Sequence, residues 1–136
     1  MLFSKPCQYA ILTMTCLAKT SSNQFLSIRE LGELAQVPTP FLGKIITTLS
    51  RARLITGRRG PNGGVMLGRP PAEIRVSDIV EAIAGPLDQQ GCILGLPRCN
   101  EQYPCPLHAS WKRLEIQLDQ ELHSLTLADL VCASGS

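Results

Sequence analysis

Residues 54–67, LITGRRGPNGGVML, decide the fold, because two short apolar runs there flank a turn of glycine, proline and asparagine. This pattern predicts a β-hairpin, since such turn residues adopt the backbone angles that reverse a chain between two strands. The tip of the hairpin carries two arginines, Arg58 and Arg59. A hairpin with a basic tip is typical of the wing in a winged-helix domain when three helices precede it.

The chain before the hairpin has the spacing of three helices. Apolar residues recur every three or four positions within residues 5–19, which predicts the first helix. Ser27 and Glu30 form a capping box at the start of a short second helix. We expect Thr39 to cap the third helix and Pro40 to lie in its first turn. The side chains of the second and third helices expected to face the core are Ile28, Leu31, Leu34, Ala35, Phe41, Leu42, Ile45, Ile46 and Leu49.

The chain after the hairpin predicts two further helices and a loop. A short helix is expected at residues 76–84, and an irregular loop at residues 87–105. Within residues 106–125 leucines and a tryptophan recur at steps of three and four, which predicts one long helix, followed by a last helical turn at residues 127–131. The expected fold class is mainly α with a small β-hairpin: a winged helix-turn-helix followed by a long C-terminal helix.

Charge divides the chain into two halves. The formal net charge is only +2, but residues 1–70 hold nine basic and two acidic residues, and residues 71–136 hold four basic and nine acidic residues. The halves therefore carry net charges of +7 and −5. We expect residues 1–70 to form a winged-helix domain that meets a polyanion, and residues 71–136 to form one compact unit with it.

The basic half points to DNA as its polyanion. A helix that reads the major groove presents short polar and basic side chains while its other face is buried. The helix-turn-helix order, the basic tip and the net charge of +7 occur together, which favours double-stranded DNA over the alternative of a solvated basic surface. The candidate DNA contacts are Thr39, Pro40, Lys44, Thr47, Thr48, Arg51, Arg58, Arg59, Gly60, Asn62 and Gly63.

The loop after the second half's first helix contains a candidate metal centre. Cys92, Cys99 and Cys105 lie within this loop, and His108 follows the third cysteine by three residues. Three thiolates and an imidazole suit either a tetrahedral zinc ion or an iron–sulfur cluster. Three reduced cysteines that bind nothing are the alternative.

Several classes of protein are not expected. No stretch approaches about 18 consecutive apolar residues, and no secretion signal is visible, so we expect a cytoplasmic protein without a membrane partner. In the cytoplasm, clustered cysteines are more often metal ligands or redox sensors than disulfides. No nucleophile–base pair and no phosphate-binding loop is visible, so we expect no enzyme and no small-molecule substrate.

These features together resemble the Rrf2 family of bacterial transcription regulators, of the iron–sulfur-binding type represented by IscR, NsrR and RirA. The resemblance extends from residue 1 to about residue 131. It rests on the sequence RGPNGG at residues 59–64, the three-cysteine loop, CPLH at residues 105–108 with Trp111 after it, and LTLADLV at residues 125–131.

The resemblance implies a homodimer in which two winged helices read a palindromic operator, usually as a repressor. The long helices of the two subunits would cross, with a dimer interface at Trp111, Leu114, Leu118 and Leu122. The resemblance also implies an iron–sulfur cluster on the three cysteines, sensing iron–sulfur, redox or nitric oxide status. Family members with a [2Fe–2S] cluster have a histidine ligand at the position of His108.

Other interpretations of the loop stay open: a [4Fe–4S] cluster, a zinc ion that staples an interaction module, or a thiol–disulfide switch without metal. In members with a [4Fe–4S] cluster, an aspartate from the partner's first helix is a ligand, and the comparable residue here is Gln8, which favours His108 and [2Fe–2S]. The interval between Cys92 and Cys99 is one residue longer than in the best-known members. Gly43 stands where related recognition helices carry an acidic residue, so the operator sequence does not carry over.

Overall fold

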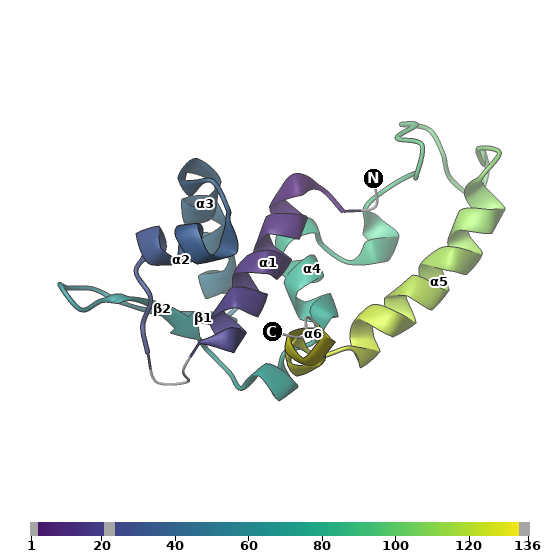
Figure 1. The fold of residues 1–136 in the computed structure, drawn as a ribbon. Helices are drawn as coiled ribbons and strands as arrows, with labels where there is room; N and C mark the ends of the chain where they lie inside the picture. The colour runs from purple at the N-terminus through teal and green to yellow at the C-terminus, as the bar shows by residue number, and fades with distance from the viewer. Residues whose placement is uncertain (1–2, 21–23, 134–136) are drawn as a thin grey trace.

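The computed structural model describes residues 3–20 and 24–133. The predicted fold class is confirmed, because the described chain is mainly helical with a two-stranded hairpin (Figure 1). Its elements are α1 (Lys5–Lys19), α2 (Ile28–Ala35), α3 (Thr39–Arg51), β1 (Ile55–Arg58), β2 (Gly64–Leu67), the 3-10 helix η1 (Pro71–Glu73), α4 (Val76–Ala84), the 3-10 helix η2 (Leu87–Gln89), α5 (His108–Ser124) and α6 (Leu127–Ala133).

Helix α1 lies at the centre of the molecule. Figure 1 shows α2 and α3 on one side of it and α4 and α6 on the other. Met14 and Leu17 of α1 are buried in one hydrophobic core together with Leu42 of α3, Ile79 of α4 and Leu127 of α6. Burial of each such side chain contributes about 1.5–3 kcal/mol. The winged-helix half and the C-terminal half therefore share a single core.

In the helix-turn-helix, the N-terminal cap of α2 is the one that the sequence predicts, whereas the N-terminal cap of α3 is a different residue. The Ser27 hydroxyl accepts a hydrogen bond from the Glu30 N–H at 3.1 Å, and the Glu30 carboxylate accepts one from the Ser27 N–H at 3.2 Å. The prediction that Thr39 caps α3 is wrong, because Thr39 is the first helical residue. Pro38 takes the cap position, since its carbonyl accepts the N–H groups of Phe41 and Leu42.

Three residues predicted to face the core are exposed. On α2, Leu31 is fully buried while Ile28 and Leu34 are 39% and 61% exposed. Residues three positions apart on a helix are offset by about 60°, so Ile28 and Leu34 flank Leu31 and only the centre of the stripe is covered. On α3, Phe41 is 51% exposed and packs its ring against Tyr9 at 5.7 Å.

The base of the wing is attached to the chain before α2. Strands β1 and β2 pair antiparallel, with Ile55 opposite Leu67. Leu26 adds a bridge to β2, because its N–H donates to the Val65 carbonyl at 2.9 Å and its carbonyl accepts from the Val65 N–H at 2.7 Å. Gly64 permits this approach: its φ is +148°, and a Cβ atom there would lie 2.1 Å from the Leu26 carbonyl oxygen.

The C-terminal half is attached to the same body by α4 and α6. Val76 and Val80 of α4 pack with Cys7 and Leu122 in a second hydrophobic cluster. Helix α5 begins at His108, two residues later than predicted, and extends away from the body as a long arm (Figure 1). The chain then returns, and the Leu127 N–H of α6 donates to the Ile74 carbonyl at 2.8 Å. Among the described helices, none is both long enough and apolar enough to span a bilayer.

The close approach at Gly64 generates a stability prediction. Gly64→Ala should lower the free energy of unfolding by about 1–3 kcal/mol, because its methyl group would displace Leu26 and break the bridge to β2. Gly43→Ala is the matched control: this exposed helical glycine has open space around its Cβ position. The control should gain roughly 0.5–1 kcal/mol from helix propensity. Urea unfolding measures both, and a Gly64→Ala protein as stable as the wild type would contradict the importance of this close approach.

Candidate nucleic-acid interface and metal centre

Helix α3 has one buried face and one polar face, as a recognition helix requires. Both threonine hydroxyls near its middle donate to the helix backbone, from Thr47 to the Gly43 carbonyl at 2.9 Å and from Thr48 to the Lys44 carbonyl at 3.0 Å. Their oxygen lone pairs stay free to accept hydrogen bonds. Of the candidate contacts on α3, Thr48 is half-buried and the following are exposed: Thr39, Pro40, Lys44, Thr47 and Arg51.

The two arginines of the wing have different surroundings. The Arg58 guanidinium lies over the Phe25 ring, 4.4 Å from its centroid, and donates to the Asn62 carbonyl at 2.9 Å. Arg58 therefore stabilises the tip of the wing, and a cation–π contact of this kind contributes about 0.5–1 kcal/mol at an exposed site. Within the described residues, no ion pair or hydrogen bond engages the Arg59 side chain, which leaves it available to a phosphate or a base edge.

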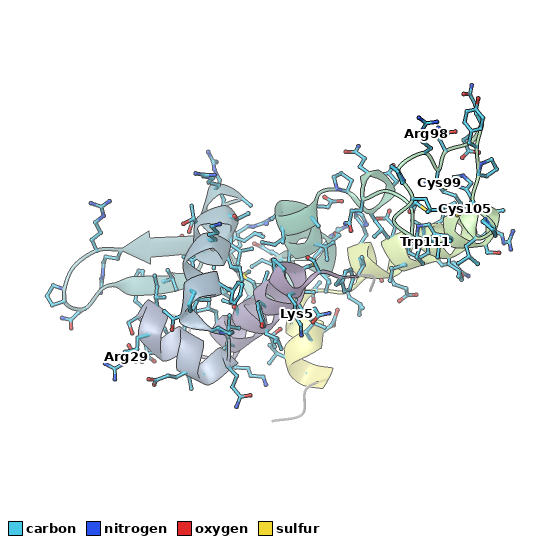
Figure 2. The ribbon with its side chains drawn as sticks, turned by 90° about the horizontal axis from the view of Figure 1, so that it is seen from above. Lys5, Arg29, Arg98, Cys99, Cys105 and Trp111 are labelled. Atoms are coloured by element: carbon cyan, nitrogen blue, oxygen red, sulfur yellow. The ribbon has the colours of Figure 1, made fainter. Side chains whose placement is uncertain are left out.

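The three loop cysteines converge at the other end of the molecule. Figure 2 shows Cys99, Cys105 and Trp111 together at the end opposite Arg29 of the winged helix. The sulfur atoms of Cys92, Cys99 and Cys105 all lie within 4.8 Å of one another, and those of Cys92 and Cys105 are 3.6 Å apart. Two thiolates on one zinc ion are separated by about 3.8 Å, because each Zn–S bond is about 2.3 Å long.

Backbone N–H groups of the loop point at these sulfur atoms. The Leu94 N–H donates to the Cys92 sulfur and the Cys105 N–H donates to the Cys99 sulfur, each at 3.4 Å. A cavity of about 240 Å³ opens among the three cysteines, His108 and Trp111. The loop therefore supplies hydrogen bonds that favour thiolates, and space beside them.

The cysteines differ in acidity. A hydrogen bond from the backbone of Leu96 is the largest effect that lowers the pKa of Cys92 to about 7, against its partial desolvation. The backbone N–H of Cys105 favours the Cys99 thiolate, but desolvation and the neighbouring sulfur atoms of Cys105 and Cys92 outweigh it and raise the pKa of Cys99. Cys92 is therefore the first of this pair to ionise.

His108 lies beside the cysteines at the first position of α5. Its Nδ1 atom is 3.3 Å from the Cys99 sulfur, and its Nε2 atom is 3.2 Å from the Glu101 carboxylate. The structure thus places all four predicted ligand side chains around one cavity. Three thiols and one imidazole form a donor set that suits zinc or an iron–sulfur cluster, so the residues present fit either group.

The predicted dimer interface is only partly available on the single chain. Leu122 is buried in the protomer's own second cluster, and Leu118 packs against the same cluster. Leu114 and Ile116 of α5 are 56% and 60% exposed, and Trp111 is half-buried. A role in dimerisation stays a prediction for Trp111, Leu114, Leu118 and Leu122. Ile116 is a further candidate, because it is exposed and lines the same shallow pocket of α5 as Leu114.

Sequence reasoning missed two residues that the geometry brings into these sites. Phe25 lies outside the helix-turn-helix pattern, and nothing in its local sequence predicts that Arg58 stacks on it. Glu101 stands between the second and third cysteines, and a carboxylate inside a cysteine loop is the signal that would have drawn attention to it. Both contacts are tertiary or loop-specific, so helical periodicity does not reveal them.

Comparison with known proteins places the chain in a family. The profile of the Rrf2 family, described as an iron-dependent transcriptional regulator, matches residues 3–133. The chain belongs to the Rrf2 family. It is therefore a DNA-binding transcription regulator of the helix-turn-helix type and not an enzyme, as predicted.

Individual relatives agree with this family. The chain is 32% identical to an HTH-type transcriptional regulator of Azotobacter vinelandii, over 93% of this chain and 77% of that protein. It is 28% identical to the regulator IscR of Sodalis glossinidius, over 91% of this chain and 74% of that one. Among solved structures, IscR of T. potens has a TM-score of 0.76 at 25% identity, covering 97% of this chain and 87% of that one. CymR of B. subtilis shares the fold, with a TM-score of 0.78 at 24% identity and 96% coverage of both chains.

The free Arg59 side chain generates a binding prediction. Arg59→Ala should weaken binding to duplex DNA and lower the slope of log K against log salt by about 0.9 for each wing that loses a phosphate contact. Fluorescence anisotropy at several salt concentrations measures both quantities. Arg113→Ala is the control, because it removes the same charge from α5. Equal affinity and slope in the two variants would contradict the assignment of the wing.

The acidity of Cys92 generates a pH prediction for the reduced, metal-free protein. The thiolate is the nucleophile, so alkylation of Cys92 should be slow below pH 7, rise through its pKa of about 7 and level off above it. Burial raises the pKa of Cys7 to about 11, so Cys7 should stay unmodified over the same range. Peptide mass spectrometry after timed iodoacetamide treatment measures each site. A rate at Cys92 that rises only above about pH 8.5, the ordinary region for a thiol, would contradict the geometry of the loop.

Proposed function

We propose that this protein is a homodimeric repressor whose binding to a palindromic operator is controlled by an iron–sulfur cluster, most simply [2Fe–2S], held by Cys92, Cys99, Cys105 and His108. The observation that carries the proposal is the convergence of three sulfur atoms within 4.8 Å at one end of a chain whose other end is a winged helix. The iron-dependent description of the family and the likeness to IscR support it.

The arrangement of the loop would depend on whether a cluster is bound in it. A bound cluster would supply a group that reacts with oxidants and nitric oxide and exchanges electrons. Cys92 lies just after η2, and His108 is the first residue of α5, so shared ligation would tie the two ends of the loop together. When the ligands separate, the start of α5 loses that tie. The loop is therefore the element with two arrangements that an effector needs in order to change DNA affinity.

A path of packed side chains leads from the loop to the winged helix. Leu122 and Leu118 of α5 pack against α4, and α4 packs against both α1 and α3. Helix α3 presents the polar face described above. A change in the direction of α5 would reach the recognition helix through these contacts.

A second copy of the chain completes the proposed regulator. Leu114 and Ile116 are exposed on the arm formed by α5, where a crossing helix of the partner would cover them. A twofold axis through such a crossing would relate the two recognition helices by the same symmetry as the two half-sites of a palindromic operator.

Visible absorbance of the wild type and of one cysteine variant tests whether a cluster is bound. Protein purified without oxygen should be brown, with visible absorbance and iron and sulfide in proportion. Cys99→Ala should lose this absorbance while its circular dichroism and oligomeric state stay unchanged, because one of four ligands is gone. Cys132→Ala is the control, since this exposed cysteine lies on α6. Colourless wild-type protein with one zinc per chain would contradict the proposal.

A thiol–disulfide switch is the second candidate, and the 3.6 Å between the Cys92 and Cys105 sulfur atoms favours it. Peroxide would accept two electrons and two protons from the two thiols as the S–S bond forms, and would leave as water. Colourless metal-free protein in which peroxide links these two cysteines, as shown by peptide mass spectrometry, would support this candidate over the cluster.

A further inference from the structure

We propose that Glu101 is the residue that orients His108 toward the metal centre, and that it makes Nδ1 the ligating nitrogen. This inference rests on the proposed function, because it concerns how one ligand of that centre is held. Glu101 would not touch the cluster, so it is a positioning residue.

The two nitrogen atoms of His108 have different neighbours. Nε2 lies 3.2 Å from a carboxylate oxygen of Glu101, and Nδ1 lies 3.3 Å from the Cys99 sulfur. An ionised carboxylate only accepts hydrogen bonds, so Nε2 carries the hydrogen atom in this pair. In the neutral imidazole that ligates metals, Nδ1 then keeps its lone pair on the side of the Cys99 sulfur.

Burial supports the same division. The His108 side chain is 13% exposed and the Glu101 side chain is 86% exposed. The imidazole therefore lies between solvent and cavity, with Nε2 on the side of the carboxylate and Nδ1 on the side of the sulfur atoms.

Hydrogen bonds fix the backbone at both Glu101 and His108. The Asn100 side-chain oxygen accepts the N–H groups of Gln102 and Tyr103, each at 2.8 Å, and this holds the turn that carries Glu101. The His108 N–H donates to the Cys105 carbonyl at 3.0 Å, which fixes the start of α5 relative to the third cysteine. The turn thus presents Glu101 to the outer edge of the imidazole ring.

With a metal centre bound at Nδ1, the contact between Glu101 and His108 would complete a carboxylate–histidine–metal triad. In metalloproteins such a carboxylate fixes the tautomer and ring orientation and raises the basicity of the ligand, and its loss costs about 10–100-fold in metal affinity or activity. The negative charge of Glu101 would also disfavour the reduced state of a bound cluster. Removal of Glu101 should therefore weaken cluster retention and raise the reduction potential.

The test compares anaerobically prepared wild type, Glu101→Ala, Glu101→Gln and Asp88→Asn. Asp88 lines the same cavity but makes no hydrogen bond to His108, so Asp88→Asn controls for lost charge. Cluster retention against an excess of iron chelator should fall about 10–100-fold in Glu101→Ala and less in Glu101→Gln, whose amide oxygen still accepts from Nε2–H. Asp88→Asn should retain its cluster as the wild type does. Pulsed electron paramagnetic resonance of the reduced cluster should show a histidine nitrogen coupling that changes in both Glu101 variants and stays unchanged in Asp88→Asn.

The outcomes separate this inference from the proposed function. A wild type that binds no cluster would contradict the proposed function and the inference with it. A wild type that binds a cluster, with retention and nitrogen coupling unchanged in Glu101→Ala, would overturn the role of Glu101 and leave the proposed function standing. Circular dichroism of the metal-free variants separates a lost orientation from a lost fold. If Glu101→Ala unfolds, Glu101→Leu takes its place in the same two readouts, because leucine has a similar size but no acceptor for Nε2–H, whereas Glu101→Gln keeps one.

Discussion

The burial of α1 between the two halves is the contact on which the rest of the structure depends. Met14 is fully buried and Leu17 nearly so, and the core around them includes side chains of α3, α4 and α6. Truncation of such a residue to alanine costs about 2–5 kcal/mol, a large part of the roughly 5–15 kcal/mol that stabilises a typical domain. Because both halves pack on α1, the half that carries the cysteine loop and the half that carries the winged helix are connected through one packed core.

Charge complements this arrangement. The half with a net charge of +7 contains the winged helix, and the half with −5 contains the cysteine loop and α5. Neutralised phosphates release counterions, so the basic half supplies affinity for DNA that depends on salt. The acidic half is repelled by the same phosphates. The small total charge of +2 is therefore the sum of a basic half that contains the winged helix and an acidic half that contains the cysteine loop.

Most of the elements could be predicted from local pattern, whereas several side-chain roles could not. The capping box at Ser27 and the glycine-rich turn of the wing act through neighbouring backbone, so their sequence signals are sufficient. Phe41 and Leu34 have the spacing of core residues, yet the neighbouring helices are too few to cover them. Leu122 has the spacing of the predicted dimer interface and is also buried against α4 within the chain, so periodicity alone does not say which contact it makes. Such outcomes depend on which helix lies beside which, and periodicity does not contain that information.

The cysteine site, too, could be predicted only in part. Residue types and spacing predicted that three cysteines and His108 would converge, and the structure brings these side chains to one cavity. The differences among these four side chains could not be predicted, because the pKa of Cys92 is lowered chiefly by a backbone hydrogen bond from Leu96, and His108 has a loop-specific contact with Glu101. Backbone hydrogen bonds inside an irregular loop have no sequence signature of their own.

The central claim is that the state of the loop sets the affinity for DNA, and one binding measurement tests it directly. A duplex selected from a random pool by the cluster-loaded protein is titrated with that protein and with the same preparation after its cluster is removed without oxygen. At fixed salt, the two values of Kd should differ by at least about fivefold, the lower end of typical allosteric coupling. Equal values of Kd for the loaded and stripped protein would contradict the claim.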